Sequence, residues 1–125
     1  MNGLKTYVEV ELGGKERLLK FDFNSVAEVE EYFGKGIGAI FNEQQVGLNT
    51  MRIFYWAGLK WKVKNVTPHL VGTWLGESLQ EGESMQTLMR PIFKALQLSG
   101  IMGKAMDEED NEEENEEYEE NPEKN

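Results

Sequence analysis

The residue types that do chemistry in proteins are concentrated here in one histidine and one run of carboxylates. Residues 107–125 contain twelve Asp and Glu residues and one Lys, His69 is the only histidine, and there is no Cys. Carboxylates bind calcium or transfer protons only when a fold fixes their geometry, and this run lacks the glycine that an EF-hand loop requires. One histidine forms neither a zinc site nor a catalytic triad. We therefore expect no metal site, no cofactor and no catalytic residue, hence no enzyme.

The densest local constellation combines Trp56 and Trp61 with Lys60, Lys62 and Lys64. In one interpretation the tryptophans stack on bases and the lysines pair with phosphates, so that the segment contacts nucleic acid. Alternatively, the lysines lie at the C-terminus of a predicted helix, where cations suit the helix dipole, and the tryptophans supply core or interface bulk. We favour the second interpretation, because an acidic segment in the same chain would compete with phosphate. A further interpretation, in which the acidic segment itself binds these lysines, stays open.

Charge divides the chain into two parts. Residues 1–106 have a net charge of +1 and residues 107–125 a net charge of −11. The acidic part has Tyr118 as its one aromatic residue and no Val, Ile or Leu, so it cannot bury enough apolar surface to fold. We predict one folded domain over 1–106 and a disordered acidic tail over 107–125. The N-terminus shows no signal-peptide pattern and no apolar stretch is long enough to span a bilayer, so we expect an intracellular protein.

Apolar residues alternate with polar ones on both sides of Gly13-Gly14, which predicts a β-hairpin. A two-residue turn would pair Leu12 with Lys15, whereas a four-residue loop would pair Leu12 with Arg17. We prefer the four-residue loop because it brings more apolar residues opposite one another. Helices must then cover the shared apolar face, which holds Val8, Val10, Phe21 and Phe23.

Helical patterns fill the rest of the domain. Ser25 with Glu28 reads as a capping box that opens a short helix ending at Gly34, and residues 36–41 read as a short helical piece. Asn49 or Thr50 is expected to cap a helix over 51–62. Apolar residues occur on every side of this helix. Such a helix is either central to the domain or presents one face to a partner.

Two further amphipathic helices complete the pattern. Thr67 followed by Pro68 predicts a helix start. The last helix covers 85–96 and stops at Ser99-Gly100, and we expect Pro91 to kink or divide it. The prediction is an α+β domain in which an N-terminal β-hairpin packs on about four α-helices, with a disordered acidic C-terminal tail.

Four blocks of this sequence resemble tail assembly chaperones of long-tailed bacteriophages and the related gene-transfer-agent tail proteins. They are YVEVELGGK at 7–15, FDFNSVAEVE at 21–30, FYWAGL at 54–59 and LMRPIFKAL at 88–96. The resemblance implies a non-enzymatic helper in the cytoplasm of the bacterial host, which coats the tape-measure protein while the tail tube polymerises. It also implies that a longer form, made by a ribosomal frameshift, can exist.

The resemblance names the tape-measure protein as the partner, with the tail tube protein as a further one; self-association stays open, and no membrane or nucleic acid is expected. Exposed apolar surface is what such a chaperone needs, and on that basis the candidate contact residues are Trp56, Trp61 and Met89. The alternative function is an acidic mimic of nucleic acid that binds a basic protein surface. Deletion of 107–125 separates the two, because it abolishes binding by a mimic and spares binding by a chaperone.

Overall fold

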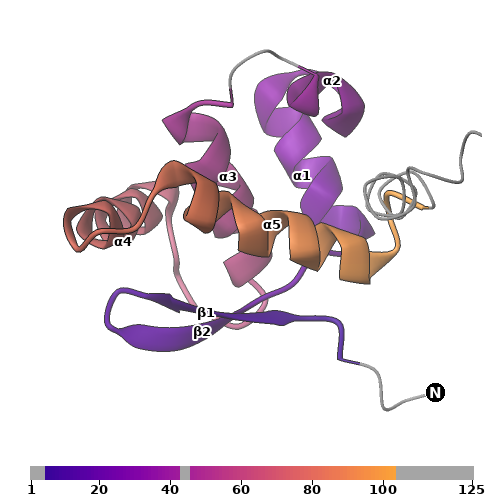
Figure 1. Cartoon of the computed structure of the whole chain (residues 1–125). Helices are drawn as coiled ribbons and strands as arrows, with labels where there is room; N and C mark the ends of the chain where they lie inside the picture. Colours follow the sequence, from indigo (N-terminus) through magenta and orange to yellow (C-terminus); the bar gives the residue numbers. More distant parts are fainter. Residues whose placement is uncertain (1–4, 43–45, 104–125) are drawn as a thin grey trace, which may run out of the picture.

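The computed structural model describes residues 5–42 and 46–103 of the 125-residue chain. It contains an antiparallel hairpin of β1 (Val8–Leu12) and β2 (Lys15–Leu19), followed by α1 (Phe23–Phe33), α2 (Ile37–Phe41), α3 (Leu48–Leu59), α4 (Pro68–Gln80) and α5 (Met85–Ser99). The helices lie on one side of the hairpin (Figure 1). This confirms the α+β prediction, with the short piece at 36–41 forming α2. The predicted acidic tail and the boundary at 106 lie outside the described residues.

The hairpin uses the two-residue turn, so the preferred four-residue loop was wrong. Leu12 pairs with Lys15 and Val8 pairs with Leu19. Gly13 and Gly14 have φ angles of 64° and 77°, the left-handed values that a tight primed turn requires at both positions. The turn chemistry therefore outweighed the pairing of apolar side chains.

Arg17 explains why this register is acceptable although it puts a charged residue opposite Val10. The Arg17 guanidinium lies over the Trp74 ring, 3.9 Å from its centroid, and Nε donates to the Leu12 carbonyl at 2.7 Å. An arginine whose stem and head both find partners can occupy a position on the inner face of a sheet. Helix α4 thus accommodates a charged residue on the inner face of the hairpin.

The same turn gives a prediction with its own matched control. A Cβ added at Gly13 would lie 2.5 Å from Trp74 Nε1, whereas one added at Gly14 would meet no atom within 4 Å. Both positions have positive φ, so alanine at either costs about 1–2 kcal/mol of backbone strain. We expect Gly13→Ala to destabilise the protein clearly more than Gly14→Ala in urea titrations followed by circular dichroism. Equal losses would show that the indole moves aside freely.

Helix α1 begins earlier than the sequence pattern suggested. Its N-cap is Asp22, whose side chain accepts a hydrogen bond from the Ser25 amide at 2.9 Å, while Ser25 Oγ accepts from the Asp22 amide at 2.9 Å. Ser25 is therefore the third helical residue and not the cap, and Glu28 is free to reach another helix. Phe23 becomes the first residue of α1 and is 77% exposed, so its predicted place on the buried hairpin face was also wrong. The helix ends at Gly34, as predicted.

Helix α3 is the centre of the domain. It contacts β2, α1, α4 and α5, and most of its side chains are buried. It begins at Leu48 after an N-cap at Gly47 and ends at Leu59, so the predicted limits of 51 and 62 and the predicted caps Asn49 and Thr50 were wrong. Asn49 instead accepts hydrogen bonds from the Arg52 side chain. The all-round apolar pattern is thus explained by burial on every side.

The last two helices follow the sequence pattern closely. Thr67 caps α4 by accepting from the Leu70 amide at 3.1 Å, and Pro68 takes the first helical position. Helix α5 runs without division through Pro91 to a left-handed Gly100. Its buried stripe packs on the core through Leu88, Ile92, Ala95 and Leu96.

Candidate functional site

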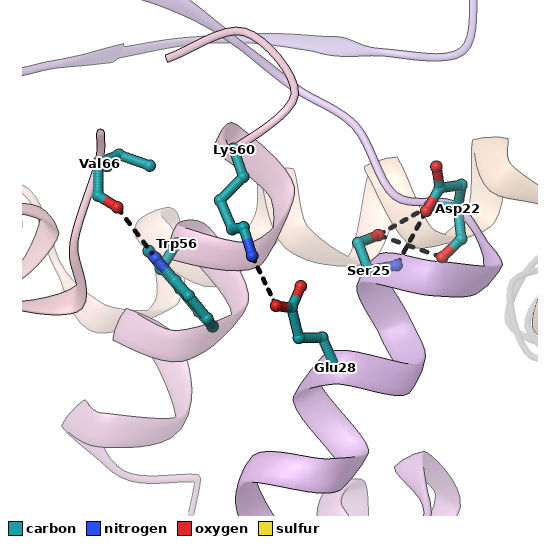
Figure 2. A network of polar contacts seen from close by, with 6 residues as sticks. All are labelled: Asp22, Ser25, Glu28, Trp56, Lys60 and Val66. Atoms are coloured by element: carbon teal, nitrogen blue, oxygen red, sulfur yellow. Dashed lines mark hydrogen bonds and ion pairs between the residues drawn. The ribbon is translucent and has the colours of Figure 1, made fainter. Parts of the chain in front are cut away.

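Trp56 has a structural role. Its side chain is half-buried, and its Nε1 donates a hydrogen bond to the Val66 carbonyl at 3.2 Å (Figure 2). This bond ties the segment that connects α3 to α4 to the side of α3. Lys60 Nζ lies 4.4 Å from the Trp56 ring centroid and 2.6 Å from Glu28 Oε2. This network joins the end of α3 to α1, so Trp56 is committed to contacts within the domain.

Trp61 is the more accessible of the two tryptophans of this constellation. It lies after the end of α3, 43% exposed, and its Nε1 donates to the Leu18 carbonyl of β2 at 3.0 Å. Its ring faces Tyr7 at 6.2 Å, and the ammonium groups of Lys20 and Lys62 lie 4.8 and 5.4 Å from its centroid. We call Tyr7, Lys20, Trp61 and Lys62 the Trp61 patch. The patch combines two aromatic rings with two cations. The hydrogen bond from Trp61 to the Leu18 carbonyl holds the Trp61 ring against the hairpin.

Met89 lies on a different surface. Met85, Met89 and Phe93 recur every four residues and therefore line one side of α5, next to its buried stripe. Met85 and Met89 are half-buried and Phe93 is 37% exposed. The Phe93 ring contacts the Phe41 ring of α2 with centroids 5.2 Å apart. We call Met85, Met89, Phe93 and Phe41 the α5 edge.

An aromatic stack fixes the α5 edge to the core. The Phe41 ring stacks on Phe54 at 5.2 Å with 16° between the planes, and Phe54 meets Phe21 edge-on at 6.0 Å. Phe54 and Phe21 are buried. The exposed ring of Phe93 is therefore the outer end of a row of rings that starts in the core.

The three predicted contact residues do not form one site. Trp56 and Trp61 belong to the segment at and after the end of α3, and Met89 belongs to the α5 edge. The residue missing from the predicted contact residues is Phe93, which is 37% exposed on the same side of α5 as Met89. The four-residue recurrence of Met85, Met89 and Phe93 is the signal that separates this edge from the stripe.

Tyr55 is a polar group in the core. Its hydroxyl donates to the Leu88 carbonyl at 2.6 Å, which joins α3 to α5. Burial raises the pKa of the Tyr55 hydroxyl well above its ordinary value, and the negative charge of Glu83 raises it further. A phenol held neutral in this way serves structure and is not poised for proton transfer near neutral pH.

An acidic hollow of about 230 Å³ lies beside the hairpin turn, where carboxylates surround Trp74. Its acidic residues are Glu11, Glu77, Glu81 and Glu83. Over residues 5–42 and 46–103, no three or more His, Cys, Asp or Glu side chains are grouped so that they would hold a metal ion. His69 is exposed on the first turn of α4.

The fold and these surfaces define a small α+β domain with an apolar edge on α5 and a basic aromatic patch around Trp61. Comparison with protein-family models, with curated proteins and with solved structures gave no match. Within the part of the chain that the structure describes, no helix has the length and apolar character needed to cross a bilayer.

Proposed function

We propose that this chain is a tail assembly chaperone of the long-tailed phage type, which binds the tape-measure protein in the cytoplasm of the bacterial host and assists tail tube assembly without catalysing a reaction. The observation that carries the proposal is the α5 edge. Large apolar side chains on a folded surface mark sites of protein contact when they are grouped. The sequence blocks that resemble tail assembly chaperones include residues 88–96, which contain Met89 and Phe93.

The dimensions of the α5 edge suit a helical partner. Met85 and Phe93 are eight residues apart, which is about 12 Å along a helix axis, or a little over two turns. An amphipathic helix binds a surface of this length through side chains at every third or fourth position. The row of rings from Phe21 to Phe93 supports the Phe93 ring from the side of the core. Methionines suit the varied side chains that a long helical protein presents.

The charge of the sequence agrees with this role. A protein that exposes a sticky edge needs net charge to stay in solution, and residues 107–125 carry a net charge of −11. In this proposal the folded domain binds the partner and the acidic segment opposes aggregation. Trp61 remains the second candidate contact, whereas Trp56 is assigned to the structure of the domain.

The test is co-expression of the full chain with the tape-measure protein from the same gene neighbourhood, followed by size exclusion with light scattering. We expect a soluble complex with the unmodified chain and at least a tenfold loss of complex with Met89→Gln/Phe93→Gln. Leu98→Gln is the matched control, because Leu98 is 36% exposed on the same helix but lies about 140° round from Phe93. Trp61→Gln, run in parallel, tests the second candidate contact.

The outcomes separate the proposals. No complex with the unmodified chain would contradict the chaperone function. A complex lost equally in Leu98→Gln and in the edge variant would contradict the assignment of the α5 edge alone. Binding to basic proteins that is lost when 107–125 is deleted would favour the acidic mimic instead. Thermal unfolding of each variant establishes that it remains folded.

A further inference from the structure

Within residues 5–42 and 46–103, the Trp61 patch carries two cations without carboxylate partners. Lys60 is paired with Glu28 at 2.6 Å and Lys5 with Glu9 at 3.8 Å. Lys20 and Lys62, which flank the Trp61 ring, have no carboxylate within ion-pair distance among the described residues. Asp22 and Glu28 line the same shallow hollow as Lys20 and Trp61, and Glu28 is already engaged by Lys60. The patch therefore presents uncompensated positive charge on an aromatic platform.

The two ends of the hairpin have different surroundings. The acidic hollow lies beside the turn at Gly13-Gly14, where Arg17 lies over the Trp74 ring, whereas Tyr7, Lys20 and Trp61 lie at the open end of the two strands. Strands of five residues separate the two ends by about 16 Å. In Figure 1 the turn lies on the side of α4, and the open end lies on the side of the C-terminal half of α5. Lys20 and Lys62 attract an acidic ligand to the open end.

We propose that the acidic segment 107–125 of the same molecule binds the Trp61 patch. The segment carries twelve carboxylates and one lysine, while the rest of the chain has a net charge of +1, so charge complementarity singles out this segment as the ligand. This interaction goes beyond the proposed function and does not depend on it. Carboxylates of the segment pair with Lys20 and Lys62, the two cations at the Trp61 ring.

The reach of the chain permits this contact. The described residues end at Gly103, and the 22 residues that follow span up to about 70 Å when extended. A domain of about 100 residues has a radius of gyration of only about 13 Å, so every surface of it is accessible to the segment. Tethering gives an effective concentration in the millimolar range, which allows a weak electrostatic contact to be populated. Charge pattern, and not distance, then selects the site.

The consequence is that Trp61 is covered by an internal competitor. Any anionic ligand that approaches Lys20 and Lys62, phosphates included, must displace the segment. The contact weakens with salt, because the screening length falls to about 3 Å at 1 M ionic strength.

The test compares the full chain with a variant of equal length in which all twelve Asp and Glu residues of 107–125 are Asn and Gln. In ¹H–¹⁵N spectra at low salt, the Trp61 indole and Lys62 amide signals are expected to differ between the two proteins. Added NaCl is expected to move the signals of the unmodified chain to the positions of the neutralised variant. The indoles of Trp56 and Trp74 serve as internal controls and stay in place.

Two further variants locate the contact. Lys20→Gln/Lys62→Gln in the unmodified chain is expected to remove the salt response of the Trp61 indole, whereas Arg90→Gln/Lys94→Gln on α5 is expected to leave it. Signals that do not change on tenfold dilution of the protein support binding within one molecule. The proposal is overturned if neutralising the segment leaves the Trp61 signal unchanged, if all three indoles respond alike, or if the response depends on protein concentration.

Discussion

Gly58→Ala should destabilise the protein by about 1–3 kcal/mol, although alanine is the better helix former. Gly58 is buried near the end of α3, where a Cβ would lie 2.6 Å from Leu19 Cδ1 and 3.0 Å from Phe21 Cζ. Both neighbours are themselves fully buried, so neither can move without disturbing the core. The Gly58 carbonyl also accepts from the Lys20 amide at 2.9 Å, and any shift of α3 away from the hairpin weakens that hydrogen bond.

Gly76→Ala is the matched control for this prediction. Gly76 lies in the interior of α4, it is exposed, and a Cβ there would meet no atom within 4 Å. The same substitution at Gly76 is therefore expected to stabilise the protein by up to about 1 kcal/mol through helix propensity. Urea unfolding of both variants measures the difference, and stabilisation by both would show that β2 and α3 can separate at no cost.

Tyr55→Phe should cost about 1–3 kcal/mol at neutral pH, because it leaves the buried Leu88 carbonyl without the hydroxyl that donates to it at 2.6 Å. Leu88 lies in the turn before Pro91, where the proline removes the amide that would bond the Thr87 carbonyl. The Tyr55 hydroxyl thus holds α5 to α3 at the turn that the proline weakens. Thermal and urea unfolding of the variant measure the loss.

The same residue gives a dependence of stability on pH. Burial, with a contribution from Glu83, raises the pKa of Tyr55 in the folded protein above the value of about 10 that it has in the unfolded chain. The folded state therefore holds this proton more tightly, and the stability contributed by neutral Tyr55 is complete below about pH 10. It is lost as the pH rises above 10 toward the raised pKa, by about 1.4 kcal/mol per pH unit.

Tyr55→Phe removes this loss, so the stabilities of the variant and the unmodified protein should converge as the pH rises above 10. Tyr32→Phe is the control, because Tyr32 is 50% exposed and its contact is with the neighbouring Phe33 ring. Urea titrations at pH 8, 10 and 11 separate the two cases. Parallel curves for Tyr55→Phe and the unmodified protein would contradict the assigned role of the hydroxyl.

The proposals for the α5 edge and the Trp61 patch assign different partners to different surfaces. The α5 edge is apolar, which suits the apolar face of a helix of another protein. The Trp61 patch is basic, which suits the acidic segment of the same chain. Because the two tests use different variants and different measurements, either proposal can fail while the other stands.

Local chemistry in the sequence determined much of this protein. The alternation around Gly13-Gly14, the cap at Thr67 with Pro68, and the stops at Gly34 and Gly100 all act within a few residues, and each is in the structure. The division of charge at residue 107 is likewise a property of the sequence alone.

Tertiary packing decided the rest. The accommodation of Arg17 on the inner face of the hairpin depended on Trp74 of α4, and the separate roles of Trp56 and Trp61 depended on carbonyls at Val66 and Leu18. Phe93 is 37% exposed, and the Phe41 ring of α2, 52 residues earlier in the chain, contacts it. These outcomes depend on partners distant in the sequence, and residue spacing along the chain carries no information about which of them will meet.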